Sequence, residues 1–190
     1  HIMGLLSDGG VHSKIEHAEE IIRIINENGV NKICFHAFLD GRDTPVDSGL
    51  RYFIKMQDFL NEKINSKGDK RGSLVSVSGR VYAMDREKRF ERIQRVYNML
   101  TGLNFEGYTE VKDLRKSIEN NYKKELFDEF MPPMKLKESH DIENGDVVIS
   151  YNFRTDRMRE LISALSQKKF KEFERKKLEN LYVITLTEYD

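Results

Sequence analysis

The sequence is poor in the residues and runs that mark several common classes of protein. Its single cysteine, Cys34, cannot form a disulfide within the chain, and we expect it to be a small buried apolar residue. Basic and acidic residues both number 32, so the formal net charge is zero, whereas nucleic-acid-binding proteins more often carry a basic excess. No apolar run approaches the ~20 residues that cross a bilayer, and the segment HIMGLL lacks the flanks of a signal peptide. We therefore expect a cytoplasmic protein without nucleic-acid or membrane partners.

The sequence also lacks the short motifs that signal metal or nucleophilic chemistry. It contains no HExxH, no CxxC and no P-loop, and no serine stands in a nucleophile elbow. The histidines do not have the spacing of metal ligands. We therefore expect no metal site and no nucleophile within these residues.

Strand-like and helix-like segments alternate along the chain. Strands are expected at residues 2–6, 32–39, 74–78, 146–151 and 181–186. Helices are expected at residues 47–64, 85–100, 111–124 and 155–165, and after a capping box formed by Ser13 and Glu16. The segment MPPMKL cannot be helical across its prolines and is expected at a sheet edge. This alternation predicts one α/β domain over residues 1–190, with a mostly parallel sheet and helices on both faces in three α/β/α layers.

Charged side chains follow the predicted strands. They are His12 after the first strand, Arg42 and Asp43 after the second, Arg80 and Arg86 after the third, and Arg154 and Arg157 after the strand at 146–151. Parallel strands end at one edge of a sheet, where ligands bind. A guanidinium fork matches a carboxylate or a phosphate. The pattern therefore predicts a site for a small molecule with phosphate, carboxylate or both.

The two candidates that are not arginines suggest what else the ligand carries. Asp43 would accept hydrogen bonds from ligand hydroxyls, or a proton during transfer, and His12 would donate to a phosphate oxygen or shuttle a proton. Taken singly, each member also fits a plainer interpretation, such as a solvated ion pair at the turn of Arg42 and Asp43. We place Arg89, Arg92 and Arg95 on a solvated helix face.

Four motifs in this order resemble those of the cofactor-independent, or 2,3-bisphosphoglycerate-independent, phosphoglycerate mutases. They are MGLLSDGGVHS, HAFLDGRDTP, SGRVYAMDREKR and YNFRTDRMREL. The resemblance runs from residue 3 to the end of the chain and is weakest between about residues 103 and 140. It departs from the family at Thr155, where proline is usual.

The resemblance implies a two-domain enzyme that interconverts 3-phosphoglycerate and 2-phosphoglycerate in glycolysis and gluconeogenesis. One domain would resemble alkaline phosphatase and carry two manganese ions and a serine that takes up the phosphoryl group; 2,3-bisphosphoglycerate would not be required. The other, inserted domain grips the substrate, and its contacts fall on the seven side chains named above, with Asp43 as the group that handles hydroxyls or protons. The full-length enzyme is expected to be a monomer.

These 190 residues are then expected to be the substrate-gripping domain, trimmed at its front and excised from the longer enzyme. The phosphatase-like domain is absent from the sequence, so we expect the piece alone to be inactive. A non-enzymatic regulatory module that binds phosphate or carboxylate is the alternative. An RNA-binding domain is disfavoured by the zero net charge.

Overall fold

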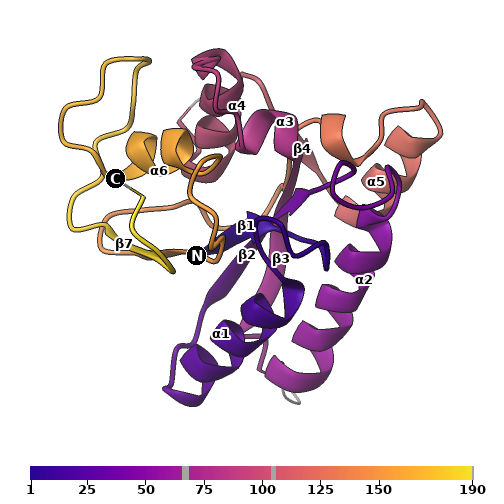
Figure 1. Cartoon of the computed structure of the whole chain (residues 1–190). Helices are drawn as coiled ribbons and strands as arrows, with labels where there is room; N and C mark the ends of the chain where they lie inside the picture. The colour runs from indigo at the N-terminus through magenta and orange to yellow at the C-terminus, as the bar shows by residue number, and fades with distance from the viewer. Residues whose placement is uncertain (66–68, 104–105, 190) are drawn as a thin grey trace.

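The computed structural model describes residues 1–65, 69–103 and 106–189, and in these residues one sheet forms the centre of the molecule (Figure 1). The strands are β1 (Ile2–Leu5), β2 (Ile33–Leu39), β3 (Gly72–Gly79), β4 (Thr109–Val111), β5 (Met134–Leu136), β6 (Val147–Ser150) and β7 (Tyr182–Thr185). Their order across the sheet is β4-β5-β3-β2-β1-β6-β7. Every neighbouring pair is parallel except β3 and β5, which are antiparallel. The predicted α/β class and mostly parallel sheet are confirmed.

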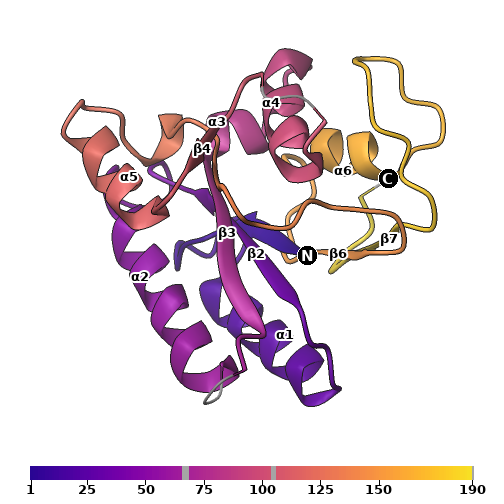
Figure 2. The ribbon, with the colours of Figure 1, turned by 180° about the vertical axis from the view of Figure 1, so that it is seen from behind.

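Helices cover the sheet on both sides (Figures 1 and 2). They are α1 (Ile15–Glu27), α2 (Gly49–Phe59), its π-helical continuation η1 (Leu60–Ile64), α3 (Arg80–Ala83), α4 (Phe90–Thr101), α5 (Leu114–Tyr122), the 3₁₀ turn η2 (Asp128–Phe130) and α6 (Arg159–Ser166). Residues of α1, α2 and α5 share one buried apolar cluster, and residues of α4 and α6 share a second cluster on the opposite side. The central strands β1, β2 and β3 are buried on both faces, as parallel strands between helical layers usually are. No helix within the described residues has the length and apolar character to cross a membrane.

Several predicted helix starts are shifted, and in two of them side chains bond to the backbone in a way that the sequence did not indicate. Ser13 does not cap α1: its hydroxyl donates to the carbonyl oxygen of Leu5 (2.6 Å), and Lys14 is the N-cap residue instead. The helix expected from residue 85 begins at Phe90, because the Asp85 carboxylate accepts from the backbone N–H groups of Glu87 and Arg89 (2.8 and 3.0 Å). Such local side-chain bonds compete with the helical ladder.

The proline-containing segment lies inside the sheet and not at its edge. β5 stands between β3 and β4, and β4 is the edge strand. Pro132 and Pro133 precede β5, so neither is required to donate to the ladder. The carbonyl oxygen of Pro133 still accepts from the N–H of Thr109 (3.0 Å). The helix expected from residue 111 starts later, at Leu114, where Asp113 caps the N–H of Lys116 (3.0 Å).

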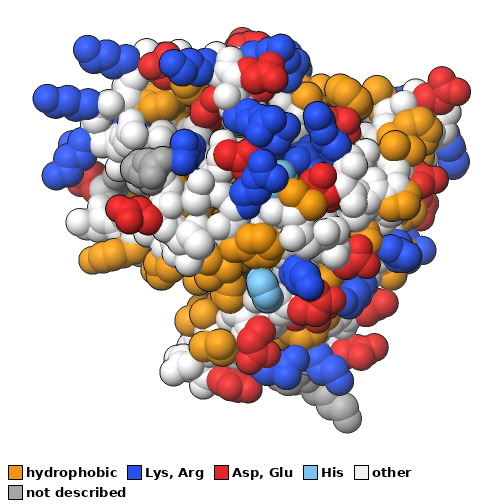
Figure 3. Space-filling model, viewed as in Figure 1, with side chains coloured by type: hydrophobic (Ala, Val, Ile, Leu, Met, Phe, Trp, Pro, Cys, Tyr) orange, Lys and Arg blue, Asp and Glu red, His pale blue; other side chains and the backbone are white. Residues whose placement is uncertain are grey.

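One part of the sheet surface has little cover. On the α1 side of β6 and β7, Val147 pairs with Tyr182 and Ile149 pairs with Ile184. Val147, Tyr182 and Ile184 are 42%, 64% and 49% exposed. Figure 3 shows hydrophobic side chains gathered along this flank of the molecule. We call these four residues the β6–β7 apolar face; burying it would release apolar surface from water.

Candidate functional site

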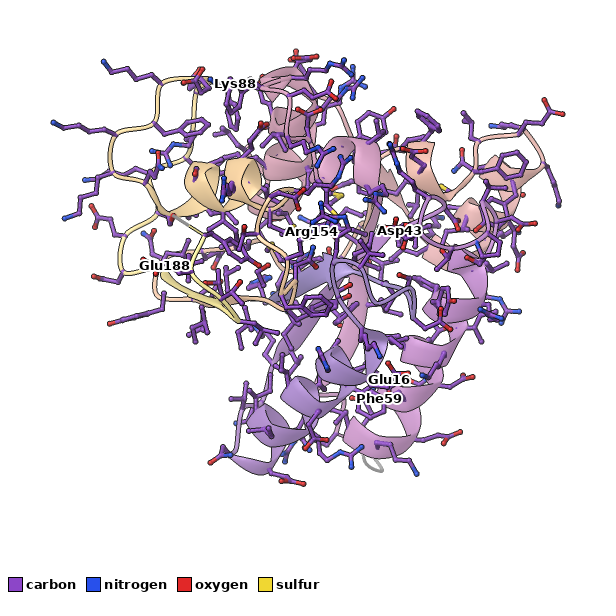
Figure 4. The ribbon with its side chains drawn as sticks, in the orientation of Figure 1. Glu16, Asp43, Phe59, Lys88, Arg154 and Glu188 are labelled. Atoms are coloured by element: carbon purple, nitrogen blue, oxygen red, sulfur yellow. The ribbon has the colours of Figure 1, made fainter. Side chains whose placement is uncertain are left out.

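All seven candidate side chains lie beyond the carboxyl ends of the parallel strands. β1 leads to His12, β2 to Arg42 and Asp43, β3 to Arg80 and Arg86, and β6 to Arg154 and Arg157. Figure 4 shows Arg154 and Asp43 near one another above the ends of β1 and β2, and Figure 3 shows Lys and Arg side chains, with acidic ones among them, at the centre of the same face. The strand order explains this convergence: β1 pairs with β2 on one side and with β6 on the other, so loops from both directions meet above it.

Arg80 is the buried centre of the site. It is the first residue of α3 and is only 2% exposed. Its Nη1 atom donates to Asp40 Oδ1 and to Asp43 Oδ2, both at 2.6 Å, and Nη2 lies 3.0 Å from His12 Nε2. Burial alone would lower the pKa of Arg80, but hydrogen bonds and charges of Asp43 and Asp40 outweigh it and raise that pKa. The guanidinium therefore stays charged and fixes Asp43 and His12 in place.

Asp40, which the sequence analysis did not single out, is the counter-ion that allows this arginine to be buried. It is 1% exposed and accepts from the hydroxyl of Ser7 (2.8 Å) and from the N–H groups of Arg42 and Asp43 (3.2 and 3.0 Å). Burial would raise the pKa of Asp40, but these hydrogen bonds and the Arg80 charge lower it. Asp40 stands in the motif FLDGRD, near two of the candidate residues. It could have been considered there, because a buried arginine such as Arg80 requires a buried acid nearby.

Gly41 and Gly79 allow η2 to pack against the loops that carry these residues. Gly41 has a φ of +65°, and a Cβ there would meet the Cβ of Asp128 at 2.8 Å. A Cβ on Gly79 would lie 2.3 Å from the carbonyl oxygen of Glu129. Asp128 is itself anchored, because it accepts from the N–H of Gly49 (2.6 Å) and from the Tyr122 hydroxyl. These contacts place Glu129 where its Oε1 atom lies 3.4 Å from Nη1 of Arg42.

Asp156 gathers the candidates on the other side of the site. Its Oδ2 atom accepts from Arg86 Nη1 (2.7 Å), and its Oδ1 atom lies 3.0 Å from Arg154 Nε and 3.6 Å from His12 Nδ1. Burial would raise the pKa of Asp156, but the Arg86 hydrogen bond and the charges of Arg154, His12 and Arg86 lower it. The sequence analysis missed this residue, although it stands inside the NFRTDR motif.

The arginines also line a small hollow. It has a volume of about 220 Å³, and its walls include Arg42, Arg80, Arg157, Asp85 and Glu129. Arg157 donates to the carbonyl oxygen of Met84 (3.2 Å), and burial and the charges of Arg80, Arg86 and Arg42 lower its pKa. Arg89 and Arg92, which we expected on a solvated helix face, line the same hollow. Mutual repulsion of this kind is relieved by an added anion.

His12 should be neutral at physiological pH. Burial, and next the charge of Arg80, lower its pKa from 6.5 to about 4. Between pH 6.5 and 4 the unfolded chain binds a proton that the folded ring does not. The lowered pKa of His12 therefore reduces the free energy of unfolding by up to about 3 kcal/mol as the pH falls through that window.

NMR titration of the His12 ring provides the measurement. We expect a midpoint near pH 4, and a midpoint above pH 6 would contradict the geometry. Stability alone is an ambiguous readout, because burial raises the pKa of Asp128 to about 6 and gives an opposite trend at overlapping pH. Comparison with a His12→Gln variant isolates the contribution of His12 to the pH dependence of stability, because only the wild type has an imidazole at this position that can take up a proton on unfolding.

Metal-binding geometry was also sought. Among residues 1–65, 69–103 and 106–189, no three His, Cys, Asp or Glu side chains come together as a metal would require. The acids near the arginines are held by hydrogen bonds and ion pairs with them. The described site is therefore suited to holding an anion.

Comparisons with known proteins place the chain in a family. The family described as BPG-independent PGAM N-terminus matches residues 1–190. The 2,3-bisphosphoglycerate-independent phosphoglycerate mutases of Staphylococcus epidermidis and Helicobacter pylori strain J99 are 41% and 42% identical to the chain, which they match over its full length. A crystal structure of Leishmania mexicana phosphoglycerate mutase, described as at low cobalt concentration, superposes with a TM-score of 0.89 at 27% identity over 98% of this chain.

The match covers only part of these proteins. The chain spans 36% of the length of each bacterial relative and 35% of the Leishmania chain. The resemblance inferred from the four motifs is nevertheless confirmed over all 190 residues. The chain belongs to the family of the N-terminal region of the 2,3-bisphosphoglycerate-independent phosphoglycerate mutases.

Proposed function

We propose that residues 1–190 bind the substrate of a phosphoglycerate mutase that interconverts 3-phosphoglycerate and 2-phosphoglycerate. The observation that carries this proposal is the convergence of five arginines with His12 and Asp43 beyond β1, β2, β3 and β6. A phosphoglycerate carries a phosphate, a carboxylate and a hydroxyl. Arginine forks suit the two anions, and Asp43 suits the hydroxyl.

In this function the buried and the exposed side chains have different tasks. Arg80 holds Asp43 so that its carboxylate, which is 20% exposed, faces solvent where a hydroxyl would lie. Arg42, Arg86 and Arg154 are 57%, 44% and 47% exposed, so they can reach a ligand in the open site. Asp43 would accept a hydrogen bond or a proton from the glycerate hydroxyl, as a general base does.

The remaining chemistry would come from polypeptide outside these residues. A serine nucleophile and two manganese ions, implied by the family resemblance, would belong to a phosphatase-like domain, and neither 2,3-bisphosphoglycerate nor a metal on this domain would be needed. The β6–β7 apolar face supports a longer polypeptide, because a further segment of the same protein would bury its four side chains. The whole protein would act as a cytoplasmic monomer in glycolysis and gluconeogenesis, without nucleic-acid or membrane partners.

An Asp43→Asn variant of the whole protein tests the proposal. We expect kcat for 3-phosphoglycerate, without added 2,3-bisphosphoglycerate, to fall by roughly 10²–10⁴-fold, the usual contribution of a general base, with a much smaller change in KM. Asp47→Asn is the matched control, since Asp47 is an exposed carboxylate in the same loop. An Asp43→Asn protein with wild-type kcat would contradict the role of Asp43.

The same assay separates the enzyme from the alternative function. We expect residues 1–190 alone to show no turnover. Turnover by the whole protein supports the mutase, whereas binding of 3-phosphoglycerate without turnover would support the regulatory, non-enzymatic module. If 3-phosphoglycerate neither binds nor turns over, the proposed ligand is wrong.

A further inference from the structure

Asp156 joins the two most exposed arginines of this side of the site to its buried histidine. One carboxylate oxygen accepts from Arg86 (2.7 Å), and the other lies 3.0 Å from Arg154. Arg86 is delivered by the segment after α3, and Asp156 and Arg154 by the loop after β6, so the Arg86–Asp156 hydrogen bond joins residues 70 apart in sequence. The carboxylate is 27% exposed, which leaves it partly shielded from water.

The ion pairs leave most donors of both arginines available. Arg154 faces Asp156 with Nε, so its two terminal amino groups are not used in that contact. Arg86 uses Nη1 and keeps Nη2 and Nε. Within the described part of the chain, these remaining donors have no protein hydrogen bond, and the two side chains are 47% and 44% exposed. Two arginines are thus held in place while their forks remain open to solvent.

Asp156 also lies close to His12, without a hydrogen bond between them. Arg80 donates toward Nε2 of His12, so the proton of the neutral ring lies on Nδ1. Nδ1 is buried without a hydrogen-bond partner among the described residues, and so is Asp156 Oδ1, at a distance of 3.6 Å. A movement of a few tenths of an ångström would bring the two atoms within hydrogen-bonding distance. Asp156 is therefore placed to orient the Nδ1 side of this ring, while Arg80 holds the Nε2 side.

We propose that Asp156 is a positioning residue that presets Arg86, Arg154 and His12 to receive one anionic group of the ligand. This inference rests on the proposed function of the site. An arginine side chain loses about 2 kcal/mol of rotamer entropy when it is ordered. Ordering the two arginines before the ligand arrives removes part of that cost from binding. Asp156 acts through these side chains and need not touch the ligand.

Simple charge repulsion gives the opposite expectation, which makes the inference testable. If Asp156 only competed with the ligand for the arginines, its neutralisation would make the site more positive and would tighten anion binding. If it positions the arginines, the same change weakens binding although the site gains positive charge. The sign of the change in Kd therefore distinguishes the two.

The experiment is calorimetric titration of the whole protein with 3-phosphoglycerate in the wild type, Asp156→Asn and Asp156→Glu. We expect Asp156→Asn to raise Kd by roughly tenfold or more, and Asp156→Glu to recover part of the loss. Glu87→Gln is the matched control: it removes one negative charge next to Arg86 in sequence, where Glu87 is 60% exposed and pairs with Arg89, and should leave Kd within about threefold. Equal or tighter binding by Asp156→Asn would overturn the inference.

A second readout does not depend on the ligand. In ¹⁵N-arginine-labelled wild-type protein, the Nη1 group of Arg86, which donates to Asp156 (2.7 Å), should give a separate, protected signal, and Asp156→Asn should broaden it or shift it to the position of a solvated arginine. A folded Asp156→Asn protein that keeps this signal would also overturn the inference. If the wild type fails to bind 3-phosphoglycerate while Asp156→Asn still loses the Arg86 signal, the proposed function fails and the positioning role stands.

Discussion

Replacement of Arg80 by methionine should destabilise the protein by roughly 3–5 kcal/mol, the usual cost of removing one partner of a buried ion pair. The cost arises because the partners of Arg80 stay in place without it. Asp40 is 1% exposed and would keep its charge without the guanidinium that accepts it, and Asp43 and His12 would lose their shared donor. Urea denaturation monitored by circular dichroism measures the change in the free energy of unfolding.

Two further variants test this explanation. Arg86→Met removes an arginine that is 44% exposed, so it should cost less than about 1 kcal/mol of stability while still weakening ligand binding. Combining Arg80→Met with Asp40→Asn should recover part of the lost stability, because the stranded charge is then removed. A destabilisation by Arg80→Met of less than 1 kcal/mol would show that water or neighbouring groups solvate Asp40 in the variant.

Replacement of Gly79 by alanine should be of similar severity although it adds one methyl group. The new Cβ would lie 2.3 Å from the carbonyl oxygen of Glu129 and 2.6 Å from that of Asp128. Both are backbone atoms of η2, so relief requires η2 to move away from β3. We expect a loss of about 3 kcal/mol or more, at the upper end for overpacked sites, and a weaker contact between Arg42 and Glu129.

Gly29→Ala is the control for this variant. Gly29 has a φ of +85°, but a Cβ there would meet nothing within 4 Å. Its cost should therefore be the backbone strain alone, about 1–2 kcal/mol. Denaturation of both variants gives the comparison. Gly79 has a φ of −71°, so alanine adds no backbone strain there, and a loss no larger than that of Gly29→Ala would show that η2 yields easily to the added methyl group.

The sequence was sufficient to predict the layers and the edge of the sheet that holds the site. Alternating strands and helices imply parallel strands, and parallel strands bring their following loops together. It was not sufficient for β4 and β5, which have three residues each and depend on pairing with each other and with β3. Pairing between distant segments leaves little local periodicity in the sequence.

The acidic residues of the site were harder to predict than the basic ones. An arginine after a strand suggests an anionic ligand, but Asp40 and Asp156 serve the arginines themselves, and only the folded geometry shows which acid meets which base. The same limit applies to Ser13, whose hydroxyl bonds to Leu5 across a turn and not to the helix that follows it. Roles of this kind arise from tertiary contacts.

The position of β1 has a consequence for how the protein folds. The sheet extends from β1 in both directions. β2 and β3 lie on one side of it, and β6 and β7, which come later in the chain, lie on the other. Arg42 and Arg80 come from the first side, Arg154 and Asp156 come from the second, and His12 follows β1 itself, so its contacts with Arg80 and with Asp156 join the two sides. An intermediate in which only one side has docked would have half a site and little affinity for an anion. Ligand should therefore stabilise only the completed sheet and should slow its unfolding without speeding the early steps of folding.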